Sequence, residues 1–181
     1  FNVTQIKIPR NDGTNLADYL LAGVSISALA VDGANRKWVG TLDNGVYVLS
    51  PDALTVENHF TVENSPLFSN EIWSIACHHT SGEVMIGTSK GLMSYQAHVS
   101  LPETSLRNDN IRVYPNPVRP DYSGQITLDG LVTDAEVRVV TEDGHLVTRG
   151  KSLGGTFTWD GRTSNGERAA SGVYYFYVAA Q

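Results

Sequence analysis

The amino-acid sequence predicts an all-β protein in two parts, a partial β-propeller of about two blades followed by a β-sandwich. The first observation is an internal repeat of 46 to 47 residues in the first half, a period that fits a four-stranded propeller blade. The second observation is a series of short strand patterns in the other half, separated by Gly and Asn-Gly turns, which is typical of an antiparallel sandwich. With 41% apolar and 18% charged residues, the 181-residue chain has a globular composition.

The repeat is visible in two passages, ISALAVDGANRKWVGTLDNGVYVL and IWSIACHHTSGEVMIGTSKGLMSY. Their first residues, Ile26 and Ile72, lie 46 residues apart, and Gly40 lies 47 residues before Gly87. Both passages open with a strand pattern that is apolar on both faces. That pattern is expected for a blade covered by a neighbour on each side.

We expect the first strand of each passage to turn at residues 32–35 or 80–83 into a second strand that ends in WVGT or MIGT. Gly45 and Gly91 then open the third strands, Asn58 to Val62 forms a fourth strand, and Val3 to Ile8 is the fourth strand of a preceding blade. One full blade and parts of two others cannot close a ring, which takes about four blades or more. We therefore expect the chain, which begins at Phe1, to be a fragment of a longer propeller protein.

The motifs of this half resemble the two-component regulator propeller repeat. Trp38-Val39-Gly40-Thr41 and Gly45-Val46-Tyr47 follow its pattern, whereas Met85-Ile86-Gly87-Thr88 replaces the aromatic residue with Met. The resemblance covers roughly Leu16 to Tyr95 and implies four-stranded blades.

The domain limits predicted from composition are residues 1–96 for the blades, 97–110 for a polar linker and 111–181 for the sandwich. The sandwich opens with an edge strand at Ile111 to Val118, because Pro115 and Pro117 cannot donate to a strand ladder. Asp160-Gly161 and Asn165-Gly166 indicate tight corners of a last hairpin. Between these ends we expect strands at Gln125 to Leu128, Ala135 to Thr141, His145 to Arg149, Gly155 to Trp159 and Val173 to Val178.

Three blocks of this half, YPNPV, VRVVTEDGHLV and TWDGR with SNGERAASGVYYF, resemble the FlgD-type Ig-like domain. That domain is the C-terminal sorting module of type IX secretion proteins in Bacteroidetes. The run VYPNPVRPDYSGQITLDGL, followed by GGTFTWDGR, is more similar still to the PorZ-like proteins, whose propellers precede such a domain. The resemblance implies an Ig-like sandwich.

The same resemblance implies a non-catalytic component of the type IX attachment machinery, exported through the periplasm to the cell surface and outer membrane. Its implied partners are attachment-complex proteins and anionic lipopolysaccharide. The chain lacks the basic tail of exported cargo, which favours a retained domain. Two alternatives stay open: the periplasmic ligand-sensing region of a hybrid two-component regulator, and a secreted glycan-active propeller protein that carries a sorting domain.

We expect no catalytic, cofactor-binding or metal-binding residue in this chain, although several side chains resemble candidates. His78 and His79 point to opposite faces of a strand, so a solvated turn is favoured over a metal site. Asp160 suits an Asx corner better than a catalytic acid. Alternation places Tyr174 and Phe176 on one face and Tyr175 and Tyr177 on the other. The cations that could contact an anionic glycolipid are Arg112, Arg119, Lys151, Arg162 and Arg168.

The remaining composition data exclude other classes. A formal net charge of -6 argues against non-specific nucleic-acid binding, and no apolar run reaches the length of a membrane span. Cys77 is the sole cysteine, so we expect a small buried hydrophobe rather than a disulfide. The incomplete blades should leave apolar faces through which the fragment associates with itself.

Overall fold

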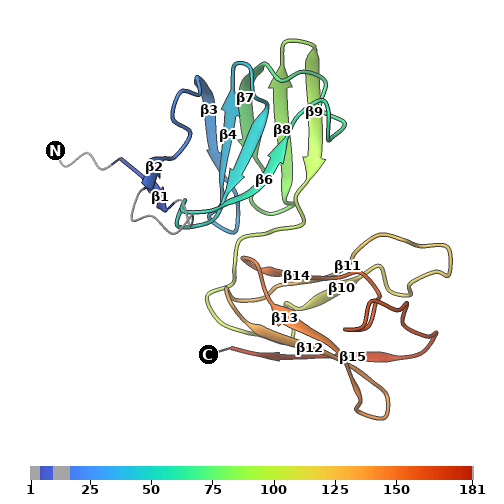
Figure 1. Ribbon diagram of the computed structural model, residues 1–181. Helices are drawn as coiled ribbons and strands as arrows, with labels where there is room; N and C mark the ends of the chain where they lie inside the picture. Colours follow the sequence, from blue (N-terminus) through green and yellow to red (C-terminus); the bar gives the residue numbers. More distant parts are fainter. Residues whose placement is uncertain (1–4, 10–16, 181) are drawn as a thin grey trace. The chain divides into compact units, whose positions relative to one another are not determined.

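In the computed structural model, which describes residues 5–9 and 17–180, every regular element is a β-strand (Figure 1). The all-β prediction is therefore confirmed. Within these residues, no helix is long and apolar enough to cross a membrane. The chain divides into two compact units, one of Phe1–His78 with Gly82–Ala97 and the other of His79–Ser81 with His98–Gln181.

The first unit contains two antiparallel meanders whose strands follow each other in sequence order. The first meander has four strands, β3 (Ile26–Val31), β4 (Lys37–Thr41), β5 (Val46–Leu49) and β6 (Val56–Phe60). The second has three, β7 (Ile72–Cys77), β8 (Glu83–Thr88) and β9 (Gly91–Gln96). These are the strand counts that the repeat predicts, although β6 begins two residues before the expected Asn58.

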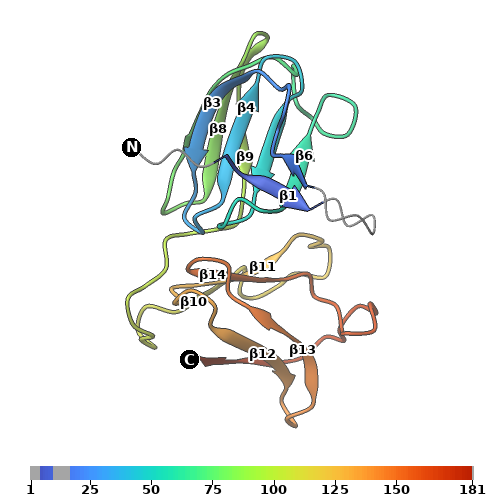
Figure 2. The same ribbon diagram turned by 60° about the vertical axis from the view of Figure 1, so that its left-hand side comes forward.

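The two meanders repeat one another in detail. Each carries a register shift one residue after its first isoleucine, between Ile26 and Ala28 in β3 and between Ile72 and Ser74 in β7. They pack face to face, as Figure 2 shows for the layers of β4 and β8. Their shared core contains Trp38, Val46, Val48, Leu67, Ile72, Val84 and Ile86.

The glycine of WVGT is required by this packing. A Cβ atom on Gly40 would lie 2.6 Å from Cγ2 of Ile72, far inside the normal contact distance of carbon atoms. The matching Gly87 meets a residue of its own meander, since a Cβ atom there would lie 2.4 Å from Oγ of Ser74, its cross-strand partner on β7. The repeat therefore preserves glycine where neighbouring strands approach most closely.

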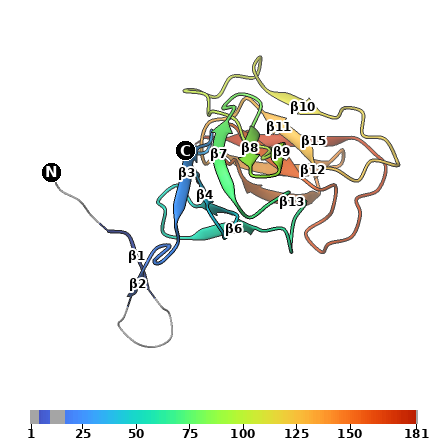
Figure 3. The same ribbon diagram turned by 90° about the horizontal axis from the view of Figure 1, so that it is seen from above.

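The N-terminal part forms a hairpin rather than a single orphan strand. β1 (Lys7–Pro9) pairs antiparallel with β2 (Ala17–Tyr19), and Figure 3 shows this hairpin beside β3. A strand was expected at Val3 to Ile8, and Val3 and Thr4 of this range lie outside the described residues. Strand β2 was not predicted, because a three-residue strand is too short to show a periodic pattern.

The second unit is a sandwich of two three-stranded antiparallel sheets. One sheet has the order β10 (Arg112–Tyr114), β11 (Ile126–Asp129), β14 (Thr156–Trp159), and the other β13 (Leu146–Lys151), β12 (Glu136–Thr141), β15 (Tyr174–Ala179). All six strands lie within a few residues of their predicted positions. The core between the sheets contains Ile126, Leu128, Leu131, Val137, Val139, Val147, Phe157 and Trp159.

The prediction of a last hairpin is wrong. β14 pairs with β11 and β15 pairs with β12, so the segment between them crosses from one sheet to the other. The Asn165-Gly166 turn closes only a local loop, in which Thr163 N donates to Glu167 O at 2.8 Å. Turn residues identify a corner, but they do not specify whether the strands on either side pair with each other.

The segment predicted as a linker contributes to the second unit from His98 onward. Val99 and Ser100 are buried. The Ser100 hydroxyl donates to Oδ1 of Asp129 at 2.6 Å, and Ser100 O accepts from Gly155 N at 2.9 Å. Leu106 packs against the core of the sandwich. These contacts could not be predicted from the polar composition of residues 97–110.

Candidate functional site

The turn between β3 and β4 contains a buried cluster centred on Asp32. The Asp32-Gly33-Ala34-Asn35 sequence turns the chain, with Asn35 at a φ of 60°. Oδ1 of Asp32 accepts from the backbone N–H groups of Ala34 and Arg36, both at 3.0 Å. A short acidic side chain at the start of a turn commonly makes such bonds.

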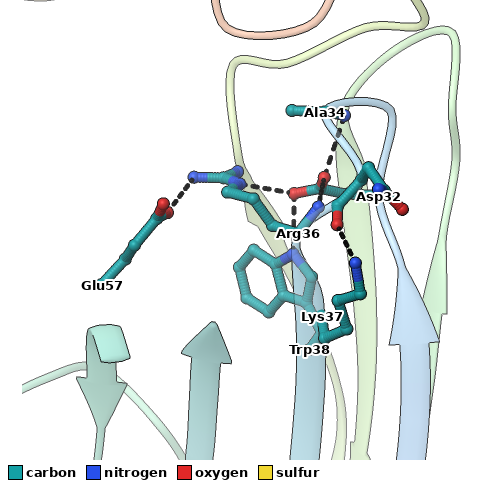
Figure 4. Close-up of polar contacts among 7 residues, drawn as sticks. Asp32, Ala34, Arg36, Lys37, Trp38 and Glu57 are labelled. Atoms are coloured by element: carbon teal, nitrogen blue, oxygen red, sulfur yellow. Dashed lines mark hydrogen bonds and ion pairs between the residues drawn. The ribbon is translucent and has the colours of Figure 1, made fainter. Parts of the chain in front are cut away.

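The second carboxylate oxygen of Asp32 binds two side chains that follow the turn (Figure 4). Oδ2 accepts from Nε of Arg36 at 2.7 Å and from Nε1 of Trp38 at 2.9 Å. The guanidinium group also lies over the Trp38 ring, 5.9 Å from its centroid, and its Nη1 is 3.7 Å from Oε2 of Glu57 on β6. Asp32 and Arg36 are 4% and 7% exposed, so this is a buried ion pair with its carboxylate fully hydrogen-bonded.

This arrangement stabilises the turn and does not suit proton transfer. The four donors occupy both oxygens of the Asp32 carboxylate, which leaves no oxygen directed at a substrate. This cluster was not among the sites predicted from sequence. The spacing of Asp32, Arg36 and Trp38, at i, i+4 and i+6 around a turn, was the signal that could have found it.

The second meander lacks the same cluster. By the repeat spacing, His78 stands where Asp32 stands, and Met85 stands where Trp38 stands. Backbone hydrogen bonds close both turns, since Gly82 N donates to His78 O at 2.9 Å and Asn35 N donates to Asp32 O at 3.0 Å. The pair of Asp32 and Arg36 is therefore not repeated with the same residue types in the second meander.

Cys77 lies near the Asp32 cluster. Burial, and secondarily the negative charge of Asp32, raise the pKa of the Cys77 thiol to about 11, against a smaller opposing effect of Arg36. The thiol is therefore protonated at neutral pH and a weak nucleophile. This agrees with the predicted role of a small apolar side chain.

In the second unit, the YPNP segment and the loop after it form an open depression of about 350 Å³. Proline rings supply apolar surface, while Arg119 and Asp121 add one charge of each sign. The lining residues are Pro115, Pro117, Arg119, Asp121, Tyr122, Ser123 and Gly124.

Arginines gather next to this depression. The Nη2 atom of Arg168 donates to Pro120 O at 3.1 Å and to Tyr122 O at 3.0 Å, which ties Arg168 to the loop that carries Arg119. Arg162 forms a β-bridge with Arg168. Of the five cations considered from sequence, Arg119 and Arg168 thus share one loop, whereas Arg162 joins them through its backbone and its Nη1 atom donates to Gly166 O at 2.8 Å. Arg112 lies on β10 and Lys151 on β13, and no described contact joins either to this group.

The other sequence candidates lie as follows. His78 and His79 are exposed in the turn between β7 and β8. Within residues 5–9 and 17–180, no three His, Cys, Asp or Glu side chains are grouped so that they could hold a metal ion. Asp160 is exposed, and its Oδ1 accepts from Arg162 N at 3.0 Å, which confirms the Asx corner.

The aromatic alternation in β15 is also confirmed. Tyr174 and Phe176 pack against the sandwich core, where their rings lie 5.1 and 6.2 Å from that of Trp159. Tyr175 and Tyr177 point outward and are 49% and 63% exposed. Trp159 itself is 5% exposed, and its indole N–H donates to Arg162 O at 2.7 Å.

Comparison with solved structures identifies a protein similar to this chain over nearly its whole length. PorZ, an essential bacterial surface component of the type-IX secretion system of Porphyromonas gingivalis, is 36% identical, with a TM-score of 0.59. The match covers 97% of this chain and 23% of PorZ, so the chain spans about a quarter of the length of that relative. The chain is therefore PorZ-like in sequence and in fold.

Two further matches were found. The FlgD Ig-like domain family matches residues 120–181, in the second unit. The extracellular domain of a hybrid two-component system from B. thetaiotaomicron is 20% identical, with a TM-score of 0.36, over 91% of this chain and 23% of that protein. No curated protein sequence matches the chain.

Proposed function

We propose that this PorZ-like chain belongs to a non-catalytic surface component of the type IX secretion machinery, which acts by binding other molecules. The observation that carries the proposal is the similarity to PorZ, 36% identity over 97% of the chain. Because the similarity extends across both units, it supports a common arrangement of blades followed by an Ig-like domain. In this proposal the two meanders are the last blades of a longer propeller.

The geometry of the charged groups supports binding rather than turnover. The buried ion pair of Asp32 and Arg36 is used to hold a turn, and the Cys77 thiol has a raised pKa. The features open to solvent are instead the depression lined by Arg119 and Tyr122 and the outward tyrosines of β15. Aromatic and arginine side chains are the types enriched at protein interfaces.

In the cell, the protein would lie on the outer face of the outer membrane and keep its sandwich unit. The sandwich would dock to the attachment complex. The complete propeller would offer a rigid platform to other components, including the enzyme that processes cargo.

Anionic lipopolysaccharide is the second ligand that we propose, and Arg119, Arg162 and Arg168 are the residues that favour it. Guanidinium groups bind phosphate and carboxylate with paired hydrogen bonds. Arg119 lines the depression, Arg168 donates to the loop that forms it, and Arg162 lies next to Arg168 in the β-bridge. Substituting Arg119 and Arg168 with Glu should reduce binding to purified anionic lipopolysaccharide. Arg107→Glu is the matched control, because that side chain is 62% exposed and pairs with Asp109 away from this group.

The test of the main proposal is deletion of Ile111–Gln181 from the full-length protein in its host. The attachment complex should then fail to assemble, and cargo should be released instead of anchored. A variant with Arg107→Glu in the intact protein controls for expression and export. Normal anchoring of cargo in the deletion strain, or recovery of a mature protein that lacks these residues, would show the proposal to be wrong.

A further inference from the structure

The sandwich unit has four sheet edges, because each of its two sheets has three strands. The edge strands are β10 and β14 in one sheet and β13 and β15 in the other. An edge strand presents unpaired N–H and C=O groups to solvent and can pair with another chain. Natural proteins usually protect such edges with short length, proline, charge, a bulge or a covering segment.

Three of the four edges carry such protection. β10 has three residues and leads directly into Pro115 and Pro117. β13 bears the charged Arg149 and Lys151, and its pairing with β12 is interrupted by a bulge. At β14, the buried Ser100 forms a bridge to Gly154 and accepts a backbone hydrogen bond from Gly155, so another segment covers the start of this strand.

The β15 edge carries none of these protections. Its sequence, YYFYVA, has no charge, proline or glycine, and it pairs with β12 through six residues without a bulge. In the described part of the chain, no backbone hydrogen bond joins Tyr174–Ala179 to any element other than β12.

Apolar side chains remain partly open on both faces of β15. On the outer face, Tyr175 and Tyr177 are about half exposed or more. On the inner face, Tyr174, Phe176 and Val178 are only partly buried, although the inward valines of the neighbouring β12, Val137 and Val139, are fully buried. A further strand beside β15 would cover side chains on both faces and would satisfy the free backbone groups.

We propose that β15 pairs antiparallel with β15 of a second copy of this chain, which joins two three-stranded sheets into one of six strands. A two-fold axis brings identical strands together, and β15 has no charged residue that would repel its own copy. With the axis at Phe176, each Tyr175 faces a Tyr177 on the outer side, and each Tyr174 faces a Val178 on the inner side. Directly opposite residues in an antiparallel pair point to the same face, so outer pairs with outer and inner with inner.

The expected dimer is weak. Pairing of one six-residue strand buries less than the roughly 1,200 Å² typical of a stable interface. Association should therefore depend on protein concentration and be measurable by sedimentation velocity over a dilution series of the 181-residue chain.

Two double variants test both the strand and its register. Tyr175→Lys with Tyr177→Lys places like charges opposite each other twice and should raise the dimer dissociation constant by about tenfold or more. Tyr175→Glu with Tyr177→Lys places opposite charges in the same two pairs and should restore much of the association. Leu146→Lys is the matched control, because Leu146 is 56% exposed on the opposite edge of the same sheet. Unchanged near-ultraviolet circular dichroism would show that each variant folds.

A wild-type chain that stays monomeric at all concentrations would overturn the proposal. Both double variants are also measured with Leu29→Lys, which weakens association through the first unit, and a dimer of unchanged strength in the double-lysine variant on that background would also overturn the proposal. Association that is weakened in the double-lysine variant and restored in the Glu–Lys variant would support both the choice of strand and its register. Failure of that recovery would reject the proposed register.

Discussion

Replacing Asp32 with Asn tests the buried cluster at the first turn. The amide oxygen of Asn can still accept from the backbone N–H groups of Ala34 and Arg36. Its NH₂ group, however, would face the Nε–H of Arg36 and the Nε1–H of Trp38, which are donors now held at 2.7 and 2.9 Å by Oδ2. Two buried donors would lose their acceptor, and the guanidinium charge would keep only the longer ion pair with Glu57, at 3.7 Å.

Removing one partner of a buried ion pair costs about 3–5 kcal/mol, and each buried donor left unpaired costs about 1–3 kcal/mol. These contributions overlap, so we expect Asp32→Asn to lower the free energy of unfolding of the first unit by about 3–5 kcal/mol. The second change, Arg36→Met, removes the unpaired charge and one of the two donors. The double variant should therefore be more stable than Asp32→Asn alone, a coupling of the sign that a double-mutant cycle measures.

Cys77 gives an assay specific to the first unit, because it is the sole thiol in the chain. Its labelling by a thiol reagent over a urea series reports opening of that unit without interference from the tryptophan of the sandwich. A loss of unfolding free energy of less than about 1 kcal/mol for Asp32→Asn would contradict a stabilising role of the buried ion pair. A double variant no more stable than the single one would contradict it as well.

The remaining predictions concern other parts of the fold. Trp159→Ala should destabilise the sandwich unit by about 3–5 kcal/mol in urea unfolding; a cost under about 1 kcal/mol would contradict its burial. Gly40→Ala should destabilise the first unit, because a Cβ atom meets Ile72 at 2.6 Å. Gly172→Ala is the control, because a Cβ atom there meets no atom within 4 Å and φ is not positive; an equal effect of both changes would contradict the prediction. At pH 8 the Cys77 thiol should react at least about tenfold more slowly folded than unfolded. The pKa of the thiol in the folded chain is raised from an ordinary 9.0 to about 11. The stability that the protonated thiol contributes is therefore complete below pH 9 and is lost as the pH rises towards 11. Equal labelling rates of the folded and unfolded chain would contradict the raised pKa. Finally, exposed Leu29 of β3 and Leu92 of β9 should promote self-association through the blade faces, which Leu29→Lys should weaken in light scattering; an unaffected particle size would count against it.

The strands were predictable from sequence because their signals are local. Alternation in β15 correctly separated Tyr174 and Phe176 from Tyr175 and Tyr177, and the repeat correctly gave four strands and then three. The pairing of β14 with β11 was not predictable, because a turn sequence does not identify the partner of the strand that it ends. The contacts of Ser100 were also not predictable, because a single serine in a polar segment shows no periodic pattern that would indicate burial. The grouping of Arg119, Arg162 and Arg168 depends on residues more than 40 positions apart and required the folded chain.

The divergence of the two turns has a consequence for counting repeats in related sequences. Asp32 and Trp38 hold the first turn, whereas His78 and Met85 occupy the matching positions of the second, and yet both meanders form with the same bulge and the same close glycine. A pattern built on the acidic residue and the tryptophan would therefore find one repeat here and miss its neighbour. A pattern built on the isoleucine before the bulge and the glycine near the end of the second strand would find both repeats. These residues are required by the close approach of neighbouring strands, not by the way in which one turn is closed.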